Sequence, residues 1–330
     1  MFTGNKMKNT ILLTGSCGFI GAFVAKQLLE QGYQVVGIDN LNDYYDVSLK
    51  NHRLENLHLN SSFTFYHSDI EDRLTLKNIF EKHKFDCVIN LAARAGVRYS
   101  MINPMIYMTT NAIGTLNLLE FMKDYNVKKM VLASTSSLYA GQKMPFDETL
   151  AVNTPISPYA ASKKAAEAMT YSYHYLYGLD ISVVRYFTVY GPAGRPDMCM
   201  FRFIKWIDEG SPIELFGDGS QSRDFTYVTD IANGTIKAMR HVGYEIINLG
   251  GGNRPCPINF VISEIEKHLK KKAVINHLPF HKADILETWA NIQKANDLLE
   301  WHPTITLEEG IKNTVDWYIA NKSWVKTVKM

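Results

Sequence analysis

A tyrosine and a lysine four positions apart, Tyr159 and Lys163, are the residues of this sequence with the best-defined chemistry. On a helix these positions lie on one face, one turn apart, so the ammonium group can stabilise a phenolate. The spacing occurs four times in the chain, and the other three pairs begin at Tyr125, Tyr139 and Tyr318. About one such pair is expected by chance, so spacing alone does not choose among them.

The sequence around Tyr159 and Lys163 favours this pair. Residues 129–133 (KMVLA) are predicted to form a buried strand, which is followed by four hydroxyl side chains, Ser134, Thr135, Ser136 and Ser137. Pro158 opens a predicted helix that runs to Tyr177, and residues 180–186 form the next predicted strand. The carboxyl ends of parallel strands meet at one sheet edge, so the hydroxyls, the phenol and the ammonium should converge there.

This convergence predicts an acid–base site. Tyr159 is the expected general base for a sugar hydroxyl while hydride leaves for a nicotinamide. Lys163 is expected to hold the nicotinamide ribose and to lower the pKa of the phenol, and Thr135 to hydrogen-bond the reacting oxygen. The alternative, in which Tyr159 and Lys163 only line a helix surface, does not account for the hydroxyls beside them.

A glycine-rich turn near the start of the chain predicts the cofactor. Residues 11–21 read ILLTGSCGFIG, with Gly15, Gly18 and Gly21 three positions apart before an apolar-periodic segment at 22–29. This pattern indicates a strand, a tight turn and a helix. The glycines suit a turn with positive φ, a close approach to a ligand and tight packing of the helix on its strand. The start of the helix is a favourable site for a pyrophosphate.

Asp39 favours a dinucleotide-binding site over an ordinary strand–helix turn as the interpretation of the glycine pattern. It ends a second predicted strand at residues 34–38, at the distance where an acidic residue meets an adenosine ribose. Its carboxylate can accept hydrogen bonds from the ribose hydroxyls and would repel a 2′-phosphate. No arginine lies between Asp39 and Lys50 to counter that repulsion. NAD is therefore predicted rather than NADP.

The predicted elements alternate between strands and helices, which indicates an α/β fold with a doubly wound parallel sheet. Beyond Phe187 this alternation is broken by glycines and prolines. We expect a cofactor domain at 1–187 and a smaller mixed α/β substrate domain at 188–330, with some segments returning to the first domain. The remaining predictions are a loop at 41–53, strands at 63–67 and 86–91, and helices at 73–83 and 109–125.

The composition is that of an ordinary globular protein with a small-molecule substrate. Of 330 residues, 46% are hydrophobic and 21% are charged, and the formal charge of +2 is spread along the chain, so neither a nucleic-acid groove nor a membrane-surface patch is indicated. The four cysteines have no zinc-type spacing, and we expect neither a metal site nor disulfides. No signal peptide or membrane span is apparent, so we expect a cytoplasmic protein, with Met7 as an alternative translation start.

The glycine turn, the Tyr159-x-x-x-Lys163 pair and the hydroxyl-rich strand end resemble the extended short-chain dehydrogenase/reductase superfamily, in its nucleotide-sugar epimerase branch. Four segments are similar to the UDP-glucuronate 4-epimerases: NDYYDVSLK at 42–50, AGVRYS at 95–100, YFTVYGPAGRPDM at 186–198 and GDGSQSRDFTYVTD at 217–230. The resemblance implies a Rossmann-type fold and tightly bound NAD. It also implies that UDP-glucuronate becomes UDP-galacturonate through a 4-keto intermediate, with hydride returned to the opposite face of the sugar.

The resemblance also assigns roles to residues. Thr135, Tyr159 and Lys163 are the implied catalytic residues. The cofactor residues, besides Tyr159 and Lys163, are Gly15, Gly18, Phe19, Ile20, Gly21, Asp39, Asn40, Asp69, Ile70, Leu91, Ala92, Ala93 and Tyr186. The implied substrate residues are Arg98, Ser136, Ser137, Thr188, Arg195, Phe216, Arg223 and Asp284. The family further suggests a homodimer through the helices at 109–125 and 158–177.

The rival reactions use the same keto intermediate. Decarboxylases and 4,6-dehydratases of this superfamily carry an acidic residue where this chain has Ser137, so epimerisation is favoured. A 4-epimerase of another UDP-sugar remains an alternative. A non-catalytic NAD-binding protein is a second alternative, but such a protein would be expected to have lost one of the three catalytic residues, and this chain has all of them. The chain departs from the family pattern at Ala140 (usually glycine), at Arg94 (usually glutamine) and within 281–291. The physiological direction and the glycan that receives the product stay open.

Overall fold

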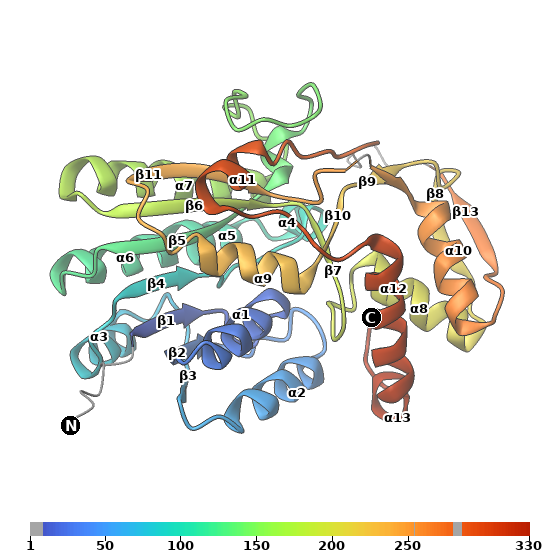
Figure 1. Cartoon of the computed structure of the whole chain (residues 1–330), viewed down its shortest axis with the longest axis horizontal. Helices are drawn as coiled ribbons and strands as arrows, with labels where there is room; N and C mark the ends of the chain where they lie inside the picture. Colours follow the sequence, from blue (N-terminus) through green and yellow to red (C-terminus); the bar gives the residue numbers. More distant parts are fainter. Residues whose placement is uncertain (1–8, 254, 280–285) are drawn as a thin grey trace.

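Seven parallel strands form one sheet in the computed structural model, which describes residues 9–253, 255–279 and 286–330 (Figure 1). The order across the sheet is β11-β6-β5-β4-β1-β2-β3. Successive strands add outward from β1 in one direction and from β4 in the other, so a crevice forms where these two strands end. The predicted Rossmann-type α/β fold is confirmed. The strands are β1 (Thr10–Thr14), β2 (Gln34–Asp39), β3 (Phe63–His67), β4 (Cys87–Asn90), β5 (Lys129–Thr135), β6 (Asp180–Tyr186) and β11 (Tyr244–Leu249).

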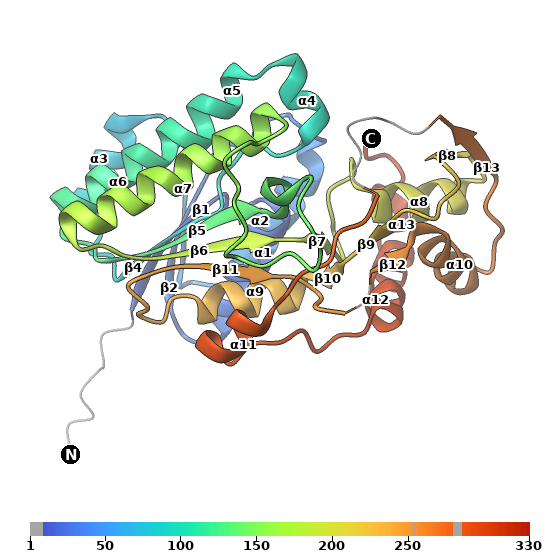
Figure 2. The ribbon, with the colours of Figure 1, turned by 90° about the horizontal axis from the view of Figure 1, so that it is seen from above.

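Helices cover both faces of the sheet, and each face has its own apolar core (Figure 2). One face carries α3 (Arg73–Lys82), α6 (Gly114–Asp124) and α7 (Pro158–Tyr177), and the other carries α1 (Phe19–Glu30), α9 (Val228–Lys237) and α11 (Gln293–Leu299). All seven residues of β5 are buried, as expected of a strand covered on both faces.

Helix α7 has the bounds that the sequence predicts, because local signals fix both ends. The Ser157 hydroxyl accepts a hydrogen bond from the Ala160 N–H at 3.2 Å, and Pro158 occupies the first turn. Gly178 ends the helix in the left-handed region at φ +64°. Tyr159 therefore lies in the first turn, next to the carboxyl ends of the strands.

A second lobe lies beyond the carboxyl ends of the strands (Figure 2). Its apolar core joins helices α8, α10 and α12. The chain leaves the sheet after β6 and later returns to add α9, β11 and α11, so residues beyond 187 contribute to both lobes. The elements of the second lobe and its connections are α8 (Cys199–Glu209), α10 (Ile258–Leu269), α12 (Leu307–Ala320), α13 (Lys322–Val325), β7 (Thr188–Tyr190), β8 (Ile213–Phe216), β9 (Ser222–Arg223), β10 (Phe225–Tyr227), β12 (Cys256–Pro257) and β13 (Ile275–Leu278).

The predicted loop at 41–53 is wrong, because α2 (Val47–His58) occupies most of it. The Asp46 carboxylate caps this helix by accepting the Ser48 N–H at 2.9 Å. The buried face of α2 includes Leu49 and Leu57 together with Lys50 and Arg53. Because two of the buried positions are cationic, the sequence lacks the regular apolar spacing that predicts an amphipathic helix.

The predicted helix at 109–125 begins earlier and is irregular. It follows α4 (Val97–Ile102), starts as α5 (Met105–Tyr107), passes through a π-helical segment at Met108–Ile113 and continues as α6. Such π-helical segments often occur near functional sites. Here the segment carries Asn111, whose side chain bonds the loop after β4.

All four cysteines are free, and two of them, Cys17 and Cys87, are buried. In the part of the chain that the structure describes, no helix is long and apolar enough to cross a membrane.

Candidate active site

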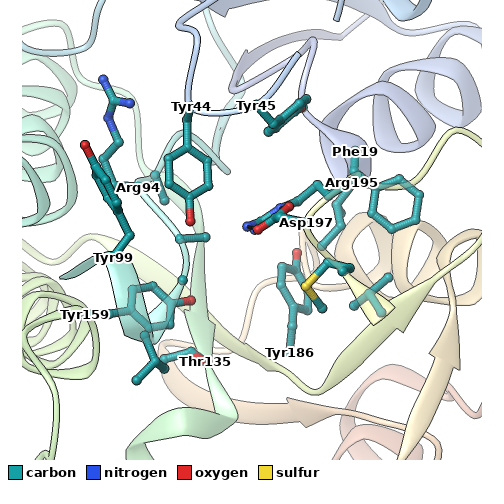
Figure 3. Close-up of a pocket in the computed structure, with 18 of the residues that line it drawn as sticks. Phe19, Tyr44, Tyr45, Arg94, Tyr99, Thr135, Tyr159, Tyr186, Arg195 and Asp197 are labelled. Carbon is teal, nitrogen blue, oxygen red and sulfur yellow. Dashed lines mark hydrogen bonds and ion pairs between the residues drawn. The ribbon is translucent and has the colours of Figure 1, made fainter. Parts of the chain in front are cut away.

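One cavity of about 790 Å³ lies at the carboxyl ends of the strands and extends into the second lobe. Its walls come from both lobes, and Figure 3 shows part of it. All the predicted site residues that the structure describes line this cavity, and Asp284 lies outside the described residues. They are Gly15, Gly18, Phe19, Ile20, Gly21, Asp39, Asn40, Asp69, Ile70, Leu91, Ala92, Ala93, Arg98, Thr135, Ser136, Ser137, Tyr159, Lys163, Tyr186, Thr188, Arg195, Phe216 and Arg223.

The glycine turn has the geometry of a dinucleotide site. Gly15 has φ +69°, and a Cβ atom there would lie 2.8 Å from the backbone nitrogen of Ala92. A Cβ on Gly21 would lie 2.0 Å from the Gly15 carbonyl oxygen, so only glycine lets α1 pack on the turn. Gly18 precedes α1, which begins without a side-chain cap. The first N–H groups of α1 can therefore donate to a pyrophosphate.

Asp39 is held rigidly at the end of β2 and is only 7% exposed. One carboxylate oxygen accepts the Cys17 N–H at 3.0 Å, and the other accepts the Leu41 N–H at 2.9 Å. The Lys50 ammonium of α2 lies 3.9 Å from Oδ1 of Asp39. Burial lowers the pKa of Lys50, and Asp39 opposes that shift. Sequence reasoning missed Lys50 because the segment that carries it was predicted to be a loop.

Thr135 and Tyr159 lie together at the cavity wall, as Figure 3 shows. The Thr135 side chain favours the charged form of the neighbouring phenol, because it lowers the pKa of Tyr159 against the effect of burial. The Thr135 oxygen also accepts the Ser137 N–H at 3.1 Å, which orients the hydroxyl. Lys163 points into the same cavity from the next turn of α7, and its ammonium donates to the Ala133 carbonyl at 2.9 Å. The structure thus brings the three predicted catalytic side chains together.

The pKa of Tyr159 is raised by burial, and the Thr135 side chain and the Arg195 charge only oppose that shift. The expectation that Lys163 lowers this pKa is therefore not met in the structure. The reason is that the Lys163 ammonium is directed to the Ala133 carbonyl. Burial lowers the pKa of Lys163 to about 8, against the opposing effect of Glu167.

A buried ion pair fixes α7 against the sheet. The Glu167 carboxylate accepts two hydrogen bonds from Arg185 of β6, at 2.9 Å and 2.7 Å, and both side chains are 1% exposed. The same carboxylate accepts the Ser134 hydroxyl at 2.6 Å. This network ties the helix of Tyr159 to the strand of Thr135, and sequence reasoning missed it because its members are far apart in the chain.

Arg195 lies near the catalytic side chains but has a protein partner. It forms a two-point ion pair with Asp197, with N···O distances of 3.0 Å and 2.5 Å. Its guanidinium also lies 5.5 Å from the ring centre of Tyr44, as the grouping in Figure 3 shows. Sequence reasoning placed Arg195 at this site but missed Asp197 and Tyr44.

Two arginines that line the cavity lie over aromatic rings of the second lobe. The Arg98 guanidinium lies 4.5 Å from the ring centre of Phe216, and the Arg202 guanidinium lies 4.4 Å from that of Trp206. Nε of Arg202 is buried and has no hydrogen-bond partner among the described residues. Arg202 and Trp206 line the cavity and were not predicted from the sequence.

Two departures from the family pattern have a local explanation. Ala140 has φ −52°, which any residue adopts, and the left-handed position falls to Gly141 at φ +84°. The backbone of Arg94 is held at both ends by Asn111, whose side chain accepts the Arg94 N–H at 2.8 Å and donates to its carbonyl at 3.0 Å. Both loops therefore have a defined conformation with the residue that is present. Of the segment 281–291, residues 281–285 lie outside the described residues.

A protein-family model for GDP-mannose 4,6 dehydratase matches residues 12–314 of the chain. The UDP-glucuronate 4-epimerase of Thermodesulfobacterium geofontis (strain OPF15) is 59% identical over 319 residues, which cover 97% of this chain and 99% of that protein. The chain belongs to the nucleotide-sugar epimerase/dehydratase family. The membership expected from the sequence motifs is confirmed.

Solved structures of epimerases from this nucleotide-sugar epimerase/dehydratase family share the fold over nearly the whole chain. The UDP-glucuronic acid 4-epimerase of Bacillus cereus, in complex with UDP-glucuronic acid and NAD, has 37% identity and a TM-score of 0.86, covering 94% of this chain and 99% of that chain. The UDP-glucose 4-epimerase of Thermotoga maritima, with UDP-glucose, has 33% identity and a TM-score of 0.87, covering 95% of this chain and 99% of that chain.

Proposed function

We propose that this chain is an NAD-dependent epimerase that interconverts UDP-glucuronate and UDP-galacturonate at carbon 4 of the sugar. The observation that carries the proposal is the convergence of Thr135, Tyr159 and Lys163 in the cavity that also holds the glycine turn and Asp39. The relative at 59% identity is a UDP-glucuronate 4-epimerase, and a related structure binds both UDP-glucuronic acid and NAD.

The cavity residues fit NAD. The first N–H groups of α1 would donate to the pyrophosphate, and Asp39 would accept the hydroxyls of the adenosine ribose. Asn40 donates to Asp69 at 2.6 Å, at the expected adenine end of the site. Lys163 would hold the nicotinamide ribose. When bound, NAD supplies a hydride acceptor that later returns the hydride to the sugar.

Tyr159 would take the proton of the 4-hydroxyl as hydride leaves carbon 4, and it would return a proton when the hydride comes back. Thr135 lines the cavity next to Tyr159 and would hydrogen-bond the reacting oxygen (Figure 3). Because the Thr135 oxygen accepts the Ser137 N–H, the Thr135 hydroxyl is already oriented as a donor before the reaction begins. Epimerisation then requires the 4-keto sugar to turn over within the cavity.

The keto uronate must also keep its carboxylate. Ser136, Ser137 and Thr188 line the cavity beside the catalytic residues, and their hydroxyls can hold the carboxylate out of alignment with the neighbouring carbonyl. A hydrogen bond to a charged group contributes about 1.5–3 kcal/mol. Ser137 stands where decarboxylases and dehydratases of the superfamily carry an acid, so no carboxylate at this position assists loss of carbon dioxide or water.

The arginine-rich end of the cavity suits the nucleotide. Arg98, Arg202 and Arg223 can bind the diphosphate, and the rings of Phe216 and Trp206 offer surfaces for the uracil. Two guanidinium groups within electrostatic reach of each other, Arg98 and Arg202, favour an anion between them.

The active protein would be a homodimer. Exposed apolar side chains occur on α4, α5, the π-helical segment and α7. Figure 2 shows these helices on the outer side of the first lobe. The side chains are Met101, Ile102, Met105, Met108, Ile113, Tyr171, Tyr175 and Leu176. The α4, α5 and π-helical elements each contact α7, and exposed apolar side chains on neighbouring elements are typical of a protein–protein interface. We place the enzyme in the cytoplasm, where it would supply an activated uronate for polysaccharide synthesis.

A panel of UDP-sugars tests the proposal. The purified protein is incubated without added cofactor with UDP-glucuronate, UDP-galacturonate, UDP-glucose and UDP-N-acetylglucosamine, and the products are identified by NMR. We expect UDP-glucuronate and UDP-galacturonate to interconvert and the neutral sugars to react far more slowly. A UDP-pentose or a 6-deoxy-4-keto sugar as the main product would overturn the assignment.

A further inference from the structure

Arg53 of α2 joins the cofactor turn to the loop that carries Arg195. The Arg53 side chain is 4% exposed and makes four hydrogen bonds. Nη1 donates to the Cys17 carbonyl at 3.0 Å and to the Tyr45 hydroxyl at 2.7 Å. Nε and Nη2 both donate to the Ala193 carbonyl, at 3.2 Å and 2.6 Å. One guanidinium therefore spans three segments that are distant in the sequence.

The two bridged carbonyls belong to the two halves of the site. Cys17 lies in the glycine turn, between Gly15 and Gly18, and Ala193 lies two residues before Arg195. We call residues 191–197 the substrate loop. Its Arg195 lines the same cavity as Tyr159, and its positive charge opposes the rise that burial causes in the pKa of that phenol. Because Ala193 and Arg195 share this short loop, anchoring the Ala193 carbonyl restricts where the backbone of Arg195 can lie.

The substrate loop needs such an anchor. Ala193 has φ +50°, a left-handed conformation that is unfavourable for a residue with a side chain. Two N–H groups on its carbonyl offset this strain and fix the direction of the peptide. A fork of donors in one plane can satisfy acceptors that lie in different directions, whereas the ammonium of a lysine is a single point of charge.

We propose that Arg53 is a positioning residue for the epimerase reaction: it fixes the substrate loop against the cofactor turn so that Arg195 meets the sugar opposite Tyr159. This inference rests on the proposed function for the identity of the substrate. If Arg53 has only a structural role, replacing it should lower the stability of the protein and leave substrate binding unchanged. If it positions Arg195, replacing it should weaken substrate binding, and this effect should depend on the presence of Arg195.

A double-mutant cycle separates the two roles. Arg53→Lys, Arg195→Lys and the double variant are compared for KM, kcat, retained NAD and free energy of unfolding. We expect Arg53→Lys to raise KM for UDP-glucuronate about tenfold, the effect of a lost charge-assisted hydrogen bond, with a smaller change in kcat. In a protein that already carries Arg195→Lys, Arg53→Lys should raise KM little further, because both substitutions weaken the same contact between Arg195 and the sugar.

Tyr45→Phe and Arg73→Lys complete the design. Tyr45→Phe removes one acceptor of Arg53 without changing charge, and it should give a smaller rise in KM if Arg53→Lys fails to fold. Arg73→Lys is the matched control, because Arg73 donates to Asn117 at 2.9 Å and packs on Phe121 on a helix-covered face of the sheet. It should alter stability and leave KM unchanged.

The dissociation constant of UDP-glucuronate, measured by calorimetry, is a parallel readout that does not need turnover. If the protein turns over another UDP-sugar, the cycle is run with that sugar, so failure of the proposed function and failure of this inference are distinguishable. Additive effects of Arg53→Lys and Arg195→Lys on binding would overturn the inference. So would an Arg53→Lys variant with lowered stability and unchanged binding.

Discussion

Burial shifts the two ionisable catalytic groups in opposite directions, and both shifts disfavour charge. It raises the pKa of the Tyr159 phenol and lowers that of the Lys163 ammonium to about 8. A buried pair of this kind is poised to exchange a proton with a bound reactant, because neither side chain is stabilised in its charged form. The Thr135 side chain and the Arg195 charge both favour the phenolate, and Thr135 has the larger effect.

Replacing Tyr159 by phenylalanine should remove the general base and little else. The ring contact with Tyr107, with centroids 6.1 Å apart, can remain, so nucleotide-sugar binding should be nearly intact. Turnover should fall by roughly a hundredfold or more, the usual scale for a lost acid–base group. Steady-state kinetics together with calorimetric binding checks this. Near wild-type turnover in Tyr159→Phe would show that the base is misassigned.

Lys163 should leave a pH signature in the folding stability. Its pKa is about 8 in the folded protein, against an ordinary value of 10.5, so between these values the unfolded chain binds more protons. Its contribution to stability is complete above about pH 10.5 and is lost as the pH falls through about 8. Relative to Lys163→Met, the cofactor-free wild type should therefore lose about 2 kcal/mol of unfolding free energy between pH 10 and pH 8.

Urea titrations of both proteins at several pH values measure this difference. The methionine also removes the hydrogen bond to Ala133, which lowers stability at every pH. The titration of Lys163 is therefore measured by how the stability difference between the two proteins varies with pH. A difference between the two proteins that does not vary with pH would mean that Lys163 titrates normally.

The glycine turn places the cofactor through backbone contacts, so a single methyl group should disrupt it. Gly21→Ala would put a Cβ 2.0 Å from the Gly15 carbonyl oxygen and push α1 away from the turn. We expect the purified variant to lose most of its bound NAD. Gly32→Ala is a suitable control, since it has φ +87° but nothing within 4 Å, and it should lower stability without releasing NAD. Cofactor content after denaturation measures both, and equal NAD retention would refute the role of the turn.

The sequence predicts those elements whose ends and faces have local signals. Pro158, Ser157 and Gly178 define α7, and the apolar runs define the strands, so the sheet edge and the convergence of Thr135, Tyr159 and Lys163 could be predicted. Helix α2 could not, because its buried face is partly cationic and depends on acceptors supplied by Cys17 and Ala193. Lys50, Arg53 and the Glu167–Arg185 pair were missed for that reason: their partners are set by tertiary structure.

The architecture of the two lobes explains why the active site needs the full chain. The glycine turn and catalytic residues belong to the first lobe, whereas Arg202, Phe216 and Arg223 come from the second. The chain crosses between the lobes more than once, and α2 also contacts the C-terminal segment, where the Lys329 N–H donates to Asp46 at 2.7 Å. The lobes should therefore unfold together.

The proposed dimer face can be tested by charge. Tyr175, which is 78% exposed on α7, and Met105, which is 68% exposed on α5, lie on this face. An aspartate at either position should oppose burial of the face and give monomers in sedimentation velocity. Leu59→Asp, at a residue 86% exposed after α2, should leave the dimer intact. A wild type that sediments as a monomer at micromolar concentration would contradict the proposal.

The fate of the hydrogen on carbon 4 tests the central claim most directly. UDP-glucuronate carrying deuterium at carbon 4 is incubated with the purified protein in ordinary water, without added NAD, and the product is analysed by NMR and mass spectrometry. If the hydride is held on the bound cofactor and returned to the same sugar, the UDP-galacturonate formed should keep its deuterium at carbon 4. Loss of the label to solvent, or the appearance of a UDP-pentose instead of UDP-galacturonate, would contradict the proposed reaction.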